Sequence, residues 1–299
     1  MSVALITNFS KFFNFPKFTF DCAKNSQLKT PNYFALCSFF RTFAFMDARY
    51  KYEGVELAYS VEGEGDTVML LHGWGCDRNI WVATREWLKR SKRVVTVDFA
   101  GFGLSDEPRE VWGVEEYTRS VEALARELGI ERPTLIGHSF GGRVAIVYAS
   151  RNEVERVVLT DAAGVKPRRK LSYYYKVYSF KLMKHLLPIL IGKQKAQMLV
   201  DQRRRKSGSS DYNRATPMMR AILSKVVNED LQHLMPSVKA PVLLFWGDKD
   251  TATPITDAYT MTRKMPDTIM AVAEGAGHFA MLEQPELWFT SLGSFLNIE

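Results

Sequence analysis

A serine between glycines is the clearest candidate for chemistry in this sequence. Gly137-His138-Ser139-Phe140-Gly141 comes directly after an apolar run over 134–136 and before a second apolar run over 144–149. A serine on a tight turn from strand to helix is held in a strained backbone conformation, and flanking glycines remove the Cβ clashes of such a turn. We therefore predict Ser139 as a nucleophile. The alternative is a glycine-rich loop whose serine is idle.

Such a serine needs a base, and the chain has five histidines. His138 adjoins the serine on the same turn, so its side chain should point elsewhere. His72 follows an apolar run, and we expect it to support its own loop. His185 and His233 lie in a helical segment. His278 follows the last apolar run, in a loop of small residues, and a base there can reach a nucleophile on another strand. We predict His278 as the base; the alternative is a surface histidine.

An acid is needed to fix the tautomer of the base and to stabilise its protonated form. Asp250 is favoured by the chain order Ser…Asp…His and by its place on the loop between the last two predicted strands. Asp248, two residues earlier, is expected to make turn hydrogen bonds. Asp161 ends another predicted strand and is the rival. Asp98 precedes the serine, so we predict a structural role for it.

Acyl transfer at a serine also needs donors for the developing oxyanion, usually the largest single electrostatic contribution. One donor should be the backbone N–H of Phe140, next after the nucleophile. The second should be the backbone N–H of Trp74, in the loop that begins at His72-Gly73. A core position for the Trp74 ring is compatible with this role, because the donor belongs to the main chain.

Short apolar runs alternate with helical patterns from Tyr50 onwards. The runs cover 55–61, 67–71, 94–97, 134–136, 157–159, 242–245 and 269–273. The first alternates like a half-buried strand, whereas the continuous runs are typical of strands buried on both faces. The clearest helical spacing covers 114–128. This alternation predicts an α/β fold whose mostly parallel sheet is covered on both sides by helices.

The segment 165–235 interrupts this alternation and divides the core into 47–164 and 236–299. Helical spacing is present over 171–191, with a kink expected at Pro188, and less regularly over 218–234. We interpret the segment as a helical cap placed over the sheet. Its apolar stripes suggest an apolar substrate pocket. The residues that we assign to substrate binding are Trp74, Tyr175, Tyr178 and Phe279.

Charge is unevenly distributed over the 299 residues, although the net charge is +7. The segment 165–234 has 16 Lys and Arg against 4 Asp and Glu, and the remainder of the chain beyond residue 46 is acidic. This pattern does not predict a basic face for nucleic acid. The basic runs 168–170 and 203–206 are either solvated faces or sites for a carboxylate, a phosphate-bearing carrier or an anionic membrane surface.

The length of the apolar runs and the number of cysteines bear on the cellular compartment. No apolar run approaches the roughly 20 residues needed to span a bilayer, so we expect no integral membrane span. The cysteines at 22, 37 and 76 are odd in number and lack paired or metal-like spacing, which favours a reducing, cytoplasmic environment. Residues 1–46 hold 11 of the 19 Phe. We expect upstream sequence or a disordered extension before Met46, with an organelle transit peptide as the alternative.

The sequence resembles the α/β-hydrolase superfamily from about Tyr50 to Leu296. The motifs that carry the resemblance are Leu70–Gly75, Asp98–Asp106, Gly137–Gly142, Phe245–Pro254 and Gly275–Pro285. The resemblance implies an eight-stranded, mostly parallel sheet, a helical cap, and neither metal nor cofactor. It also implies that the acid is the second Asp of Gly247–Asp250. Because Ser139 stands where haloalkane dehalogenases and epoxide hydrolases use Asp, it excludes those branches.

The leading hypothesis is therefore a carboxylesterase-like serine hydrolase that cleaves an ester or related acyl bond of a small molecule through an acyl-enzyme. A second hypothesis is cleavage of a carbon–carbon bond in an anionic diketone-like acid, whose carboxylate the basic segment would hold. The third is a ligand-binding receptor that retains the three residues. Fold alone does not separate these functions.

Overall fold

Eight strands form one sheet in the computed structural model, which describes residues 48–167, 171–192, 194–200 and 215–298. Their spatial order is β1-β2-β4-β3-β5-β6-β7-β8. The strands are β1 (Ala48–Tyr52), β2 (Val55–Glu62), β3 (Thr67–Leu71), β4 (Arg93–Val97), β5 (Thr134–His138), β6 (Arg156–Thr160), β7 (Val242–Gly247) and β8 (Thr268–Ala273). β1 and β2 pair antiparallel, as do β2 and β4, and all other neighbours are parallel. The predicted mostly parallel, eight-stranded sheet is confirmed.

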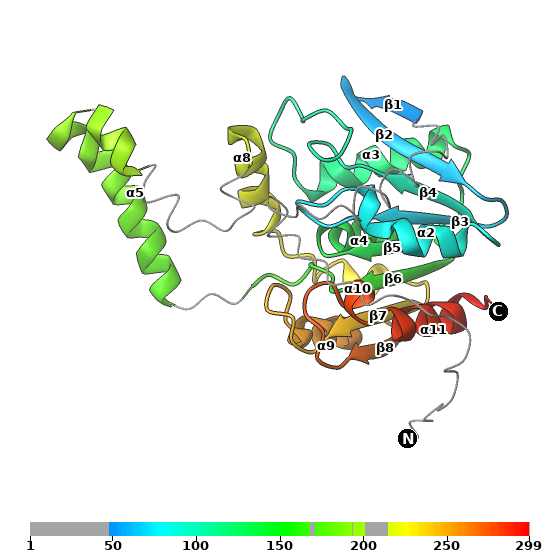
Figure 1. Ribbon diagram of the computed structural model, residues 1–299. Coiled ribbons are helices and arrows are strands. Elements are labelled where there is room, and N and C mark those ends of the chain that lie inside the picture. Colours follow the sequence, from blue (N-terminus) through cyan, green and yellow to red (C-terminus); the bar gives the residue numbers. More distant parts are fainter. Residues whose placement is uncertain (1–47, 168–170, 193, 201–214, 299) are drawn as a thin grey trace, which may run out of the picture.

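Helices cover both faces of this sheet (Figure 1). The described helices are η2 (Arg78–Trp81), α2 (Val82–Leu88), α3 (Val114–Glu127), α4 (Phe140–Arg151), α5 (Leu171–Ile191), α8 (Pro217–Val226), η3 (Met235–Ser237), α9 (Ile255–Lys264), α10 (Ala280–Glu283), α11 (Pro285–Leu296) and a further helix over 194–200. Of these, α5 and the helix over 194–200 extend away from the sheet (Figure 1). Buried residues of α3, α4, α8 and α9 join one hydrophobic core, and those of α2 and α11 join a second. The sheet separates the two cores.

The central strands supply both cores at once, because successive side chains of a strand point to opposite faces. In β3, Met69 and Leu71 belong to one core, whereas Val68 and Leu70 belong to the other. All four are at most 1% exposed. This two-sided burial explains why these strands are continuous apolar runs in the sequence.

The parallel strands bring several loops to one edge of the sheet. The loops that follow β3, β5, β7 and β8 contain Gly73, Ser139, Asp250 and His278, respectively. Because the carboxyl ends of parallel strands meet at the same edge, these residues are directed to a common region.

Between β6 and β7 the described residues form α5, the helix over 194–200, α8 and the short η3. α5 spans the predicted residues, but α8 ends at Val226, eight residues before the predicted end at Leu234. After α8, Glu229 turns toward the body: its carboxylate accepts the backbone N–H of Val114, and its carbonyl oxygen accepts a bond from Arg143. These contacts, which the periodicity does not reveal, replace the last part of the predicted helix.

Some predictions fall on residues outside the described part of the chain. These are the leader over 1–46 and the basic runs over 168–170 and 203–206. Among the helices that the structure describes, none has the length and hydrophobicity required to cross a membrane.

Candidate active site

Ser139 occupies a strained turn between β5 and α4. Its φ of 50° and ψ of −111° lie in a region that residues with a side chain rarely adopt. Glycine is required on both sides: a Cβ on Gly137 would lie 2.6 Å from the carbonyl oxygen of Gly141, and a Cβ on Gly141 would overlap that of Leu71. The sequence around the serine is therefore one that permits the turn.

Three predicted residues meet at this turn. The Nε2 atom of His278 lies 3.0 Å from Oγ of Ser139, and its Nδ1 atom lies 2.8 Å from Oδ2 of Asp250. An ionised carboxylate only accepts hydrogen bonds, so Nδ1 of His278 carries the proton in this pair. Nε2 of the neutral ring is then the acceptor for the Ser139 hydroxyl.

Asp250 is held as a carboxylate. Its Oδ1 accepts the backbone N–H groups of Ala252, at 2.8 Å, and Thr253, at 3.1 Å. Its Oδ2 accepts the Thr253 hydroxyl at 2.6 Å. Burial alone would raise the pKa of Asp250, but the bonds from His278 and Thr253 outweigh it and lower the pKa below its ordinary value. The acid is therefore ionised around neutral pH.

Asp161, the rival candidate for the acid, makes other contacts. It is fully buried, and its carboxylate accepts the backbone N–H groups of Gly247 and Ala280, each at 2.9 Å. Burial, together with the nearby charge of Asp250, raises the pKa of Asp161 to about 7. Asp161 thus joins the end of β7 to the start of α10, on either side of the loops that carry Asp250 and His278.

His138 also supports the loop of His278. Its Nε2 lies 2.8 Å from the carbonyl oxygen of His278, to which it must donate. Its ring stacks on Phe279 at 5.0 Å between centroids. Burial lowers the pKa of His138 to about 3, so the ring is neutral.

The backbone at Gly73 passes next to the nucleophile. A Cβ on Gly73 would lie 2.6 Å from Nδ1 of His138 and 3.3 Å from Cβ of Ser139. The ring of His72 holds this loop in place through two hydrogen bonds. Its Nδ1 donates to the carbonyl oxygen of Gly73 at 2.7 Å, and its Nε2 accepts the backbone N–H of Phe99 at 2.9 Å. The loop that should supply the second oxyanion donor is therefore beside Ser139.

The four residues assigned to substrate binding divide into two pairs. Trp74 packs edge-on against Phe140, with ring centroids 5.7 Å apart, and Phe279 lies edge-on to His278 at 5.5 Å. Tyr175 and Tyr178 are 76% and 65% exposed on α5, which extends away from the sheet (Figure 1). The structure thus brings Trp74 and Phe279 to the serine, but not the two tyrosines.

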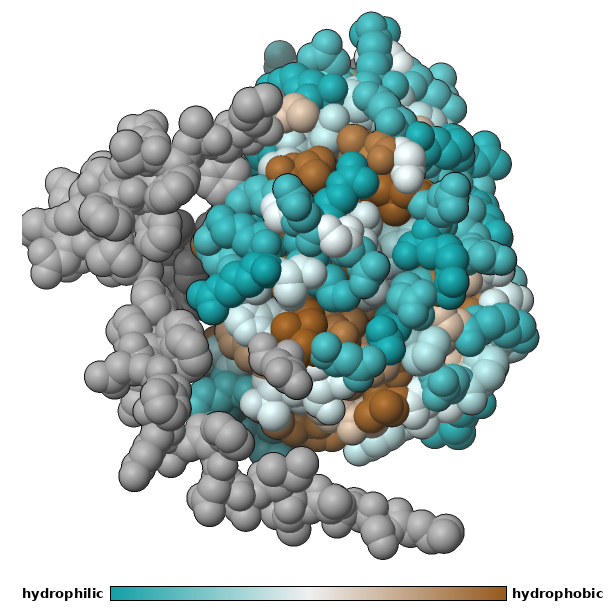
Figure 2. All heavy atoms as spheres, turned by 90° about the vertical axis from the view of Figure 1, so that its right-hand side faces the viewer, coloured by the Kyte–Doolittle hydropathy of each residue, from teal (hydrophilic) through white to brown (hydrophobic). Residues whose placement is uncertain are grey.

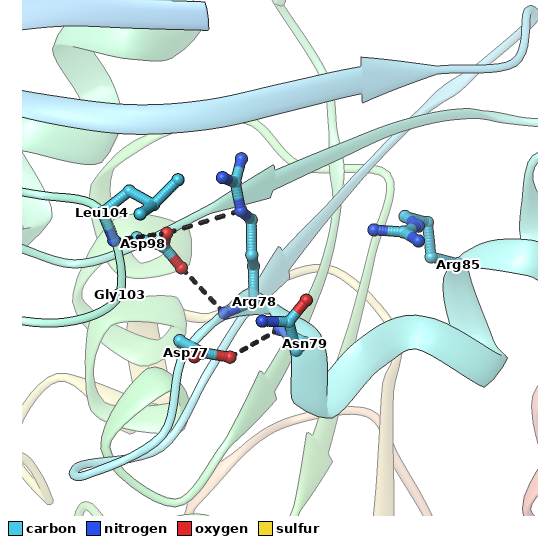
Figure 3. Close-up of a pocket in the computed structure, with 7 residues that line it drawn as sticks. All are labelled: Asp77, Arg78, Asn79, Arg85, Asp98, Gly103 and Leu104. Atoms are coloured by element: carbon cyan, nitrogen blue, oxygen red, sulfur yellow. Dashed lines mark hydrogen bonds and ion pairs between the residues drawn. The ribbon is translucent and has the colours of Figure 1, made fainter. Parts of the chain in front are cut away.

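A pocket of about 320 Å³ lies at a different place, on the loop of Asp98 (Figure 3). The Asp98 carboxylate accepts the backbone N–H groups of Arg78, at 2.8 Å, and Leu104, at 3.0 Å, and it forms an ion pair with the Arg78 side chain. These bonds agree with the structural role expected for Asp98. None of Ser139, Asp250 and His278 lines this pocket.

Thr253 is the one site residue that sequence reasoning did not single out. It lies three residues after Asp250, where a side chain on the same turn can return to the acid, and this spacing was the available signal. Within the described ranges, no cluster of three or more His, Cys, Asp or Glu residues is arranged to hold a metal ion.

The sequence of this chain matches a known protein family and several characterised relatives. The model of the alpha/beta hydrolase fold family matches residues 66–285. The pimeloyl-[acyl-carrier protein] methyl ester esterase of Aliivibrio fischeri is 25% identical over 260 residues, which cover 81% of this chain and 97% of the esterase. The 2-hydroxy-6-oxo-2,4-heptadienoate hydrolase of Pseudomonas putida is 34% identical over 118 residues, 38% of this chain and 43% of that enzyme.

Solved structures show the same architecture. The crystal structure of a membrane phospholipase A, described as a bacterial virulence factor, has a TM-score of 0.67 and 25% sequence identity, covering 88% of this chain and 91% of the other. The strained serine, the strand order and the family match agree. The chain belongs to the alpha/beta hydrolase fold family.

Proposed function

We propose that the protein is a serine hydrolase that cleaves a carboxylic ester, or a related acyl bond, through an acyl-enzyme. Ser139 is the nucleophile, His278 the base and Asp250 the acid that orients His278. The observation that carries this proposal is the continuous chain of contacts from Oγ of Ser139 through both ring nitrogens of His278 to Oδ2 of Asp250.

Acylation begins with Oγ of Ser139, whose proton passes to Nε2 of His278 as the C–O bond to the substrate carbonyl forms. The tetrahedral intermediate collapses when the protonated His278 gives that proton to the leaving alcohol. Asp250 stays ionised and stabilises the imidazolium through Nδ1. Its lowered pKa suits this role, because a protonated carboxyl group would not stabilise the charged ring.

Deacylation repeats these steps with water in place of the serine. His278 takes a proton from water as its oxygen attacks the acyl carbonyl, and the same proton then returns to Oγ of Ser139. The carboxylic acid leaves and the free enzyme is restored. In both halves, the oxyanion is stabilised by the backbone N–H groups of Phe140 and Trp74. Phe140 is the first residue of α4, and the first N–H groups of a helix have no partner within that helix.

Ester cleavage is supported by the similarity to the methyl ester esterase, because the alignment covers most of this chain and nearly all of that enzyme. The second candidate function, cleavage of a carbon–carbon bond in an anionic diketone-like acid, is favoured by the higher identity of the heptadienoate hydrolase over a shorter segment. In that reaction water activated by His278 attacks the ketone, and the carbanion fragment leaves and takes up a proton. A helical cap over 165–235, and its part in substrate binding, remain predictions.

The test is hydrolysis of nitrophenyl esters of increasing chain length by the wild type and by Ser139→Ala. We expect the variant to lose at least three orders of magnitude in kcat/KM. Ser150→Ala is the matched control, because that serine lies on α4 with its hydroxyl bonded to the carbonyl of Val147. It should keep the wild-type rate. Equal residual rates in wild type and Ser139→Ala would refute the assignment.

A parallel assay with a 2-hydroxy-6-oxo-dienoate acid separates the two candidates. A greater kcat/KM for this acid than for every ester would replace ester hydrolysis by carbon–carbon bond hydrolysis. Covalent labelling by a fluorophosphonate, present in the wild type and absent in Ser139→Ala, reports on the nucleophile independently of the substrate.

A further inference from the structure

A helical arm, formed by α5 and the helix over 194–200, extends from the body of the protein (Figure 1). It leaves the sheet after β6, and its distal end lies where α5 gives way to the second helix. The arm is not part of the arrangement around Ser139. Its surface therefore needs an explanation of its own.

One face of α5 is apolar and exposed. The residues of this stripe are Tyr175 (76% exposed), Tyr178 (65%), Leu182 (60%), Leu186 (45%) and Ile189 (81%). Their spacings of three and four residues place them within an arc of about 80° on a helix with 3.6 residues per turn. Lys184 is exposed on the opposite side of the helix. α5 thus has a continuous apolar face and a cation behind it.

The distal end of the arm continues this surface. The helix over 194–200 buries Ala196 and Val200, yet it exposes Met198 by 72% and Leu199 by 45%. Ile191, at the end of α5, is 38% exposed, but its helical spacing places it on the side of Lys184 and not on the stripe. The helix over 194–200 thus buries one side and exposes aliphatic side chains on the other, which adds to the exposed apolar surface of α5.

The charge of this part of the chain has one sign. Residues 162–200 contain nine Lys and Arg and no Asp or Glu. Lys166, Lys184 and Lys195 are exposed. A partner that covers the apolar stripe must therefore tolerate, or attract, a high density of positive charge.

We propose that the helical arm docks on an anionic lipid surface, with the apolar stripe and distal end among the acyl chains and the cations at the headgroups. Exposed aliphatic and tyrosine side chains on a segment whose charged residues are all basic combine the apolar burial and the electrostatic attraction that hold a helix at an anionic membrane interface. Tyrosine rings are suited to the headgroup level, where Tyr175 and Tyr178 would lie. The aliphatic side chains from Leu182 onward would enter more deeply.

Other partners fit this surface less well. Nucleic acid would match the positive charge but has no use for an aliphatic stripe. A second copy of the chain would bring two segments of nine cations together, and like charges at an interface oppose association. A lipid surface satisfies both the apolar stripe and the charge. By contrast, the side of the body shown in Figure 2 presents its apolar side chains in separate groups among polar ones.

The test is flotation of the full-length protein with vesicles of phosphatidylcholine alone, or of phosphatidylcholine mixed with an equal part of phosphatidylglycerol. We expect the bound fraction to be at least tenfold higher on the anionic vesicles at low salt and to fall at high salt, because salt screens the headgroup attraction. Equal binding to both vesicles, or none to either, would overturn the proposal.

Variants locate the contact. Leu182→Ser combined with Ile189→Ser should reduce the bound fraction at least tenfold. Ile269→Ser, which removes an aliphatic side chain of similar exposure (59%) from β8, should not change it. Circular dichroism and size-exclusion chromatography of each variant report folding and oligomeric state. An unchanged bound fraction in the double variant, the same loss in Ile269→Ser, or a wild-type dimer that the double variant converts to a monomer would each overturn the proposal.

The experiment does not depend on catalysis, so we expect Ser139→Ala to float like the wild type. If the wild type floats but hydrolyses none of the esters or acids tested, the hydrolase function fails and the lipid contact stands on its own. A wild type that hydrolyses esters but does not float refutes the lipid contact and leaves the hydrolase function standing. If the arm instead closes over Ser139, the double variant should change the rate of ester hydrolysis in the absence of vesicles, and the bound fraction on vesicles should not change. That result would overturn the lipid contact.

Discussion

The carboxylate of Asp161 accepts the backbone N–H of Ala280, which lies two residues beyond His278. Its other oxygen accepts the N–H of Gly247, three residues before Asp250. One buried side chain at the end of β6 thus connects the two loops that bring the base and the acid to Ser139. Asp161 therefore sets the spacing between these two loops, and with it the contact of His278 with Asp250. Asp161 itself has no role in the proton transfer from Ser139.

Asp161→Asn should make the stability of the protein depend differently on pH. The folded-state pKa of about 7 lies above the unfolded value of 3.8, so the folded state holds a proton that the unfolded state has lost between these values. The contribution of Asp161 to stability is therefore present at low pH and is lost as pH rises through about 7.

Urea unfolding at several pH values measures this effect. The difference in unfolding free energy, wild type minus Asp161→Asn, should decrease as pH rises from about 4 to about 8. Asp257, whose pKa burial raises to about 6, titrates in both proteins and cancels in the difference. A difference that is constant or that increases with pH contradicts the prediction.

Asp250→Asn should reduce kcat by about 10⁴-fold, with little change in KM, because the amide cannot hold His278 in the tautomer that accepts the serine proton. Asp248→Asn is the matched control. Asp248 accepts the N–H of Gly275 at 2.6 Å and pairs with Lys249, but it does not contact His278. The measurement is steady-state kinetics of both variants with the ester that the wild type hydrolyses fastest. An equal loss of kcat in the two variants would mean that Asp250 is not the acid that orients His278.

Thr253→Val should lower kcat by about ten- to a hundredfold. The Thr253 hydroxyl donates to Oδ2 of Asp250 at 2.6 Å and lies 3.3 Å from Nδ1 of His278. Its removal takes a hydrogen bond of about 1.5–3 kcal/mol from the charged carboxylate. Thr253→Ser restores the hydroxyl and should recover most of the wild-type kcat. A serine variant as slow as the valine variant would show that the methyl packing matters instead.

The sequence predicted those parts of the fold whose signal is local. Continuous apolar runs located β3 and β7, because both faces of these strands are buried. β1 was not predicted, since it is an edge strand whose residues are mostly exposed or half-buried and so lacks a clear apolar run. Leu234 was wrongly predicted as the end of a helix, because the chain turns after Val226 to place Glu229 against α3 and α4.

The same distinction applies to the candidate site. Ser139, Asp250 and His278 follow from a short motif, the chain order and the strand ends, and the structure brings them within hydrogen-bond distance. The bonds of Asp161 and His138 join residues 86 to 140 positions apart, so no local pattern indicates them. Only the paired strands and the loops at their ends create these contacts.

Gly73→Ala should impair both catalysis and stability through His138. The new methyl group would lie 2.6 Å from Nδ1 of the His138 ring, whose Nε2 holds the carbonyl of His278. Either the ring or the loop must move. Displacement of the loop would shift the neighbouring N–H of Trp74, the proposed oxyanion donor. We expect a loss of about 10²–10³-fold in kcat, as for one lost donor, and of about 1–3 kcal/mol in unfolding free energy.

A double-mutant cycle identifies the cause of this loss. If the clash with the His138 ring is responsible, Gly73→Ala combined with His138→Ala should lose less unfolding free energy than the sum of the single variants, because the smaller side chain leaves space for the new methyl group. Urea unfolding of the four proteins gives this coupling. Strict additivity would locate the strain in the loop itself, at the 3.3 Å approach to Cβ of Ser139. In that case kcat should stay low in the double variant.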